Sequence, residues 1–136
     1  MPTTGDASES GLIKFFQPIA DIQEIRNEFP LARGDKDKEV RFPFNSAFKF
    51  AYSVNHYKRP DSDYCAFFKG APEKIWARCK YVDVGGQPVP LTEEWNEKFI
   101  NVNKGFGARG ERVLGFAKLH LPKDKYPKGY PFNVNI

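Results

Sequence analysis

The chain has 136 residues, of which 21 are basic and 17 acidic, so its formal net charge is +4. This length suits one domain or a piece of one, and no apolar run approaches the roughly 18 residues that a membrane-spanning helix requires. Cys65 and Cys79 are the only cysteines, which argues against a disulfide-rich secreted fold and predicts two reduced thiols. The small positive charge indicates a mixed, solvated surface that leans only mildly towards anionic ligands.

The first third of the chain is expected to be mainly helical. Asp6 and Glu9 have the spacing of a capping box at a helix start. Apolar residues at helical spacing follow up to Pro18 and again over residues 19–29. The charged segment 31–38 reads as a loop.

Three strands are expected next. The first covers residues 40–44, where Pro43 indicates an edge strand or a bulge. The second covers 48–55, in which apolar and polar residues alternate with the period of a strand. The third covers 64–69 and is broken by Gly70.

The second half predicts a helix over 72–78, a hairpin over 81–89, a long helix that Thr92 caps, and a final strand over 112–121. The long helix carries an apolar stripe that we expect to face the core: Trp95, Phe99, Val102 and Phe106. Because helices and hairpin strands are intermixed, the predicted class is α+β, with a largely antiparallel sheet flanked by helices.

The proline-rich end, residues 122–136, is expected to leave the domain as an extended linker, which places the domain boundary after residue 121. Lysines interleave there with Tyr126 and Tyr130, a pattern that single-stranded nucleic-acid binders also use. Lysines in such a tail are usually only solvated, so this hypothesis ranks third and we expect no nucleic-acid partner.

One familiar motif fails its structural test. Residues 105–110 match G-x-G-x-x-G, but a helix precedes them and a strand follows, the reverse of a dinucleotide site. We interpret the match as a helix exit. His56 and His120 are isolated and lack metal-ligand spacing. The sequence therefore predicts neither catalytic residues nor a protein metal site.

Four other segments carry the functional signal. They are Gly5-Asp6-Ala7-Ser8-Glu9, Phe44-Asn45-Ser46 with Lys49, Lys69-Gly70-Ala71-Pro72-Glu73, and Gly110-Glu111-Arg112-Val113-Leu114-Gly115-Phe116. Together they resemble the nucleotide-binding domain of P-type cation-transporting ATPases, in particular the alpha subunits of sodium/potassium and proton/potassium pumps. The resemblance runs from residue 5 to about residue 132. It implies an antiparallel sheet inserted into a phosphorylation domain, with further N-terminal strands of this domain missing from the chain.

The resemblance also implies an ATP site. Phe44 would stack on the adenine ring, Lys69 would line the base of the pocket, and Gly70 would let the backbone approach the base. An aromatic platform gains about 1–3 kcal/mol from stacking a base, and glycine removes a Cβ that would collide with a ligand. Each residue also has an ordinary alternative: Phe44 in the core, and residues 69–73 as a common strand-to-helix link.

The remaining site residues come from the other segments. Lys49 would face the nucleotide, with Ser46 in the same segment, and Arg112 would reach the ribose or the phosphates. Glu9 would accept a hydrogen bond from the adenine amino group. As structural alternatives, Arg112 pairs with Glu111 or another carboxylate, and Glu9 only caps its helix.

Two positions depart from the family pattern. Ala51 stands where close relatives usually place a glutamine that helps to hold the base, and Ala117 stands where pump alpha subunits often have cysteine. The missing glutamine contact is expected to weaken or reorient adenine binding.

The implied function is to bind ATP, with magnesium carried by the nucleotide, and to present it to a phosphorylatable aspartate outside this chain. The family's Asp-Lys-Thr-Gly-Thr run is absent from the sequence, so the parent is the enzyme and this chain alone is expected to bind ATP without hydrolysing it. The implied partners are the phosphorylation and actuator domains, and the implied location is the cytoplasmic side of a membrane pump, in the plasma membrane. The alternative is a degenerate domain that serves as a protein-interaction module without useful nucleotide affinity.

Overall fold

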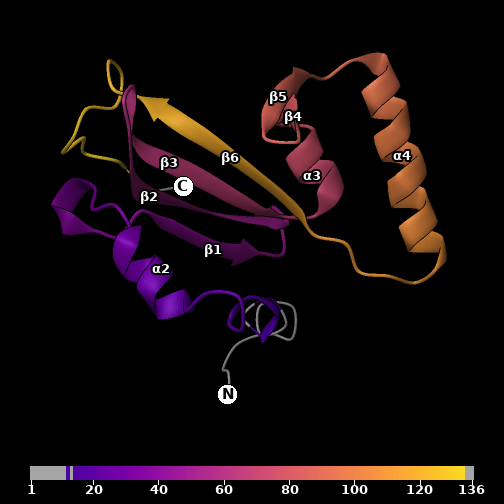
Figure 1. Ribbon diagram of the computed structural model, residues 1–136, viewed down its shortest axis with the longest axis horizontal. Coiled ribbons are helices and arrows are strands. Elements are labelled where there is room, and N and C mark those ends of the chain that lie inside the picture. Colours follow the sequence, from indigo (N-terminus) through magenta and orange to yellow (C-terminus); the bar gives the residue numbers. More distant parts are fainter. Residues whose placement is uncertain (1–11, 13, 134–136) are drawn as a thin grey trace.

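The structure is a computed structural model, and it describes residue 12 and residues 14–133. Its centre is an antiparallel sheet with the strand order β1-β2-β3-β6 (Figure 1). The strands are β1 (Arg41–Asn45), β2 (Phe50–Arg59), β3 (Ser62–Gly70) and β6 (Gly115–Pro122). Helices and a separate hairpin accompany this sheet, so the expected α+β class is confirmed.

Most of the other elements lie at one end of the sheet. They are α3 (Pro72–Trp76), the hairpin of β4 (Tyr81–Val84) and β5 (Gln87–Pro90), and α4 (Glu93–Ala108). Figure 1 shows them beyond the point where β3 ends and β6 begins, with α4 farthest from the sheet. At the start of α4, the Thr92 side chain accepts a hydrogen bond from the Trp95 N–H, as predicted.

The first helices differ in detail from the prediction. Residue 12 and residues 14–16 are helical, while the proposed capping pair Asp6 and Glu9 lies outside the described residues. The next helix, α2 (Ile22–Glu28), begins later than expected because Asp21 caps it, accepting a hydrogen bond from the Gln23 N–H at 3.2 Å. No helix in the described part of the chain has the length and apolar character needed to cross a membrane.

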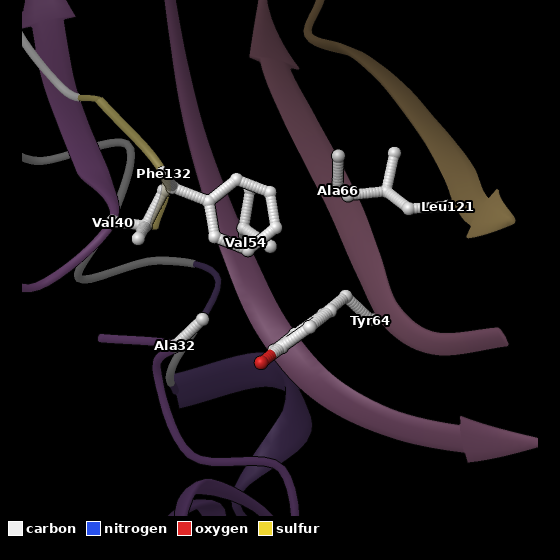
Figure 2. Packing of buried hydrophobic residues seen from close by; sticks show 7 residues of the cluster. All are labelled: Ala32, Val40, Val54, Tyr64, Ala66, Leu121 and Phe132. Atoms are coloured by element: carbon white, nitrogen blue, oxygen red, sulfur yellow. The ribbon is translucent and has the colours of Figure 1, made fainter. Parts of the chain in front are cut away.

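The buried core lies on one face of the sheet, towards the end where β2 turns into β3 (Figure 2). The sheet contributes Val54, Tyr64, Ala66 and Leu121, and segments outside the sheet add Ala32, Val40 and Phe132. Tyr64 is 2% exposed, and its hydroxyl accepts a hydrogen bond from the Gly129 N–H at 2.9 Å. This core therefore depends on residues that come after the last strand.

The segment that we expected to be a linker runs back over the sheet as far as it is described. Phe132 is 8% exposed, and its carbonyl accepts a hydrogen bond from the Asp35 N–H at 2.8 Å. Tyr126 and Tyr130 pack against the same cluster. Burial of these rings offsets the cost of ordering a proline-rich segment. It also removes the two tyrosines from any base-stacking strip.

Two strands start later than predicted, one because a turn precedes it and the other because its partner strand ends. The Asn45 carboxamide accepts hydrogen bonds from the Ala47 and Phe48 N–H groups at 2.8 and 3.2 Å, so Phe48 lies in a turn and β2 starts only at Phe50. The last strand begins at Gly115 rather than at residue 112, because its partner β3 ends at Gly70, which pairs with Gly115.

The helical predictions need two corrections. The expected helix 72–78 ends at Trp76, and the chain then turns, with the Cys79 N–H donating to the Trp76 carbonyl. The apolar stripe of α4 is not core: no residue of α4 is buried, and Val102 is 57% exposed. The motif at 105–110 does end a helix, and Gly110 follows α4 with a φ of 71°.

Gly70 lies at a close backbone contact where β2 and β3 meet. A Cβ built on Gly70 would lie 2.5 Å from the Lys49 carbonyl oxygen and 2.7 Å from the Phe50 Cα. We therefore predict that Gly70→Ala lowers the free energy of unfolding by about 1–3 kcal/mol, because the backbone has to move. Gly105→Ala is the control: its Cβ meets nothing within 4 Å, and alanine favours the helix by about 0.5–1 kcal/mol. Urea unfolding of both variants checks this, and equal effects would contradict it.

Candidate nucleotide-binding site

A row of residues crosses three strands at the end of the sheet where α3 begins. Ala51 of β2 pairs with Lys69 of β3, and Lys69 pairs with Phe116 of β6. Residues directly opposite each other in antiparallel strands project to the same face of the sheet. The three side chains therefore share one face, on strands about 4.8 Å apart.

A bulge in β1 extends this row to the fourth strand. The pairs Phe42–Tyr52 and Asn45–Phe50 flank the bulge, which leaves two residues of β1 opposite the single residue Ala51. Phe44 is one of those two. The predicted adenine platform therefore lies beside Ala51 and two strands from Lys69, and the structure brings these two predicted site residues together.

The face of this row is open and partly aromatic. The Phe44 side chain is 55% exposed and that of Phe116 is 61% exposed, so Phe44 is not a core residue. Phe116 was missed as a site residue, although it belongs to one of the four signal segments. The signal that could have identified Phe116 is its place in the last strand, where alternate residues face opposite sides of the sheet. Two exposed rings with Lys69 between them form a surface suited to a flat ligand.

The turn that holds Ser46 and Lys49 lies next to the row. Both residues are exposed. Lys49 has a φ of 64°, and its carbonyl accepts a hydrogen bond from the Ala71 N–H at 3.0 Å. The turn is therefore tied to the end of β3. The close approach seen at Gly70 is to this turn's backbone, so the glycine has a structural reason that does not involve a base, and its approach to adenine stays a prediction.

Arg112 lies in the segment 109–114, which leads from α4 into β6. It is exposed, and within the described part of the chain it has no hydrogen-bond or ion-pair partner. Glu111 instead pairs with Arg109, with the Arg109 Nε 3.3 Å from the Glu111 Oε1. The alternative of an Arg112–Glu111 pair is therefore wrong. Glu9, the last predicted site residue, lies outside the described residues.

The sequence matches the family described as P-type ATPase, cytoplasmic domain N, over residues 1–135. The chain belongs to this family. It is 40% identical over 134 residues to the sodium/potassium-transporting ATPase subunit alpha-2 of Gallus gallus, covering 98% of this chain and 12% of that protein. Its identity to the sodium/potassium-transporting ATPase subunit alpha of Tetronarce californica is 41%, over 96% of this chain and 12% of the relative. The potassium-transporting ATPase alpha chain 1 of Xenopus laevis is 39% identical, with the same two coverages.

This N domain also has two hollows on its described surface, both at the opposite end of the sheet. The first is lined by residues around Ser62 and His120, and the second by residues around Tyr57 and Lys128. Neither includes a residue of the row. Among the described residues, no group of three or more His, Cys, Asp or Glu side chains is arranged to hold a metal ion. As far as the described residues show, the candidate site is a face of the sheet that presents two exposed rings.

Burial shifts the pKa values of three titratable groups that lie away from the row. Burial raises the pKa of the Cys65 thiol and of the Cys79 thiol, which keeps both in the neutral, weakly nucleophilic form. The pKa of His120 is lowered, first by burial and then by the positive charges of Arg59 and Lys118, with Asp61 acting in the opposite direction. The Arg59 guanidinium contacts the His120 Nε2 at 2.9 Å.

The lowered pKa of His120 predicts a pH dependence of stability. A histidine whose pKa is lower in the folded state binds fewer protons there than in the unfolded chain, so stability falls as the pH drops below about 6.5. His120→Gln removes this titration and keeps an acceptor for Arg59. We expect the free energy of unfolding to fall less between pH 7.5 and 5 in this variant than in the wild type. Parallel slopes in urea unfolding would contradict the expectation.

Proposed function

We propose that this N domain binds ATP on the face of the Phe44–Lys69–Phe116 row without hydrolysing it, and that in its parent pump it presents ATP to an aspartate outside this chain. The observation that carries the proposal is the row itself: the strand register brings Lys69 and the exposed ring of Phe116 onto one face, and the exposed ring of Phe44 lies in the adjoining bulge of β1. The chain spans about 12% of the length of the curated relatives it matches. Pump activity and cation transport, which those relatives' names state, are therefore part of the proposal.

The adenine base stacks on the exposed ring of Phe44. Such stacking contributes about 1–3 kcal/mol and is available to any flat base. Lys69 lies two strands away, about 10 Å by the usual strand spacing, so its long side chain has to extend along the row to reach the edge of the base. The ring of Phe116 lies at the other end of the row. Ala51, which pairs with Lys69, contributes only a methyl group to the row.

The phosphate chain is held by positive charges at the edge of the row. Lys49 lies on the turn before β2 and Arg112 on the segment before β6, so both precede strands that start at the end of the sheet where the row lies. Charge-assisted hydrogen bonds from such groups to phosphate are stronger than neutral ones. Magnesium arrives with the nucleotide, and its charge is balanced by the phosphates.

Chemistry takes place outside this chain. The row of Phe44, Ala51, Lys69 and Phe116 contains no carboxylate, histidine or hydroxyl that would serve as base or nucleophile. The domain contributes proximity instead: it carries the γ-phosphate to the aspartate of the phosphorylation domain, and the actuator domain is the other partner. This arrangement places the domain on the cytoplasmic side of the membrane.

The proposal is tested by titrating ATP while recording amide chemical shifts by NMR. An open site with one stacked ring and a few exposed charges predicts a dissociation constant on the order of 0.1–10 mM. We expect the shifts to cluster around the row and the binding to weaken at least about tenfold in Phe44→Ala and about three- to tenfold in Lys69→Ala.

The matched controls are Tyr81→Ala and Lys58→Ala, which remove an exposed ring and an exposed lysine elsewhere. They are expected to bind ATP as the wild type does. Shifts that cluster away from the row would contradict the proposal. Unchanged ATP affinity in Phe44→Ala, together with a partner that binds independently of ATP, would favour the interaction module.

Ala51 offers a gain-of-function test. A glutamine at this position would lie directly across from Lys69 and offer an amide to the base. We predict that Ala51→Gln tightens ATP binding about three- to tenfold, the effect of one added hydrogen bond. Ala51→Leu adds similar bulk without the amide and serves as the control. Equal affinities of the glutamine and leucine variants, measured by the same titration, would rule out a polar contact here.

A further inference from the structure

Within the described part of the chain, Trp76 connects the helix α4 to the rest of the domain through a ring stack and a hydrogen bond. The rings of Trp76 and Phe99 stack with centroids 4.4 Å apart and an interplanar angle of 5°. The Trp76 indole Nε1–H also donates a hydrogen bond of 2.7 Å to the Asn96 Oδ1, one turn earlier on α4. No residue of α4 is buried, and Ile100 is 58% exposed, so its other side chains add little to the attachment.

The elements on both sides of this contact, α3 and α4, connect to parts of the candidate site. Trp76 ends the short helix α3, which starts two residues after Gly70 and packs on β6: a Cβ on Gly115 would lie 3.1 Å from that of Ile75. Ile75 itself is 4% exposed. The tryptophan is therefore fixed relative to the strands that carry the row.

The far end of α4 leads to Arg112. The Glu111 N–H donates to the Phe106 carbonyl at 3.0 Å, so the start of the segment 109–114 is bound to the last turn of α4. The guanidinium of Arg109 lies over the Phe106 ring, 4.9 Å from its centroid. The other end of the segment is fixed where Gly115 enters β6. The position of α4 therefore sets the course of the segment that carries Arg112.

We propose that Trp76 is a positioning residue for phosphate recognition: its stack on Phe99 and its bond to Asn96 hold α4 where Arg112 can reach the phosphates of a nucleotide on the row. Trp76 itself does not touch the nucleotide. This inference rests on the proposed ATP site, because Arg112 needs an anionic ligand to act on. It adds a residue that the four signal segments do not contain.

The test compares ATP with adenosine, which has the same base and ribose but no phosphates. Trp76→Leu keeps an apolar side chain and removes both the stack and the N–H donor. We expect it to weaken ATP binding about three- to tenfold, the share of one charge-assisted contact, while adenosine affinity stays within about twofold. Trp76→Phe keeps a ring over Phe99, and we expect it to recover most of the ATP affinity.

A double-mutant cycle links the effect to Arg112. In the Arg112→Ala background, Trp76→Leu should leave ATP affinity unchanged, because the group that it positions is gone. Trp95→Phe is the control on α4: Trp95 lies under the Lys98 ammonium and takes no part in the Trp76 stack. This control is expected to bind ATP normally, and it leaves Trp76 as the only tryptophan to report the docking of α4 by fluorescence.

Several results would overturn the inference. A parallel loss of ATP and adenosine affinity would mean that Trp76 only supports the fold, as would a loss that persists in the Arg112→Ala background. Unchanged ATP affinity in Trp76→Leu would remove the positioning role while leaving the ATP site intact. A wild-type protein that binds neither ligand would instead overturn the proposed function, and the inference with it. Circular dichroism checks folding; if Trp76→Leu unfolds, Phe99→Leu, which removes the stack, and Asn96→Ala, which removes the hydrogen bond, carry the same comparison.

Discussion

The structure depends on a close backbone approach between the turn before β2 and the end of β3. The Lys49 carbonyl accepts a hydrogen bond from the Ala71 N–H and lies where a side chain on Gly70 would have to be. This contact closes the β2–β3 register at the end of the sheet where the candidate site lies. It also fixes the point from which α3 begins, since Ala71 is the residue before Pro72. Glycine at position 70 is thus a condition for both the sheet and the helix.

The same register explains how the described residues of the candidate site come to lie side by side. It puts Lys69 between Ala51 and Phe116, and the bulge of β1 adds Phe44 at the end of the row. The core occupies the opposite face of the sheet, so the rings of Phe44 and Phe116 remain exposed to a ligand, while Ala51 and Lys69 are half-buried between them. An open face of this kind suits a domain that has to pick up ATP, carry it and release it, where tight enclosure would slow the exchange.

The sequence predicted the parts of this structure that local rules control. Alternation and turn chemistry gave the antiparallel strands, and the Thr92 cap gave the start of α4. It failed where distant segments decide: the apolar stripe of α4 contributes no buried residue to the core and packs on Trp76 through Phe99, while Phe132 returns to the core. At the site, the family resemblance predicted roles for Phe44 and Lys69, but pairing between strands was needed to place Phe116 beside Lys69, because that pair joins residues far apart in the chain.

The account is tested most directly by intermolecular nuclear Overhauser effects between ATP and isotope-labelled protein. The adenine ring protons and the aromatic protons of Phe44 come within a few ångström of each other only if the base stacks on this residue. The account predicts cross-peaks from adenine to the Phe44 ring. Bound ATP whose adenine shows cross-peaks to Tyr126 or Tyr130 instead, and none to Phe44, would contradict it.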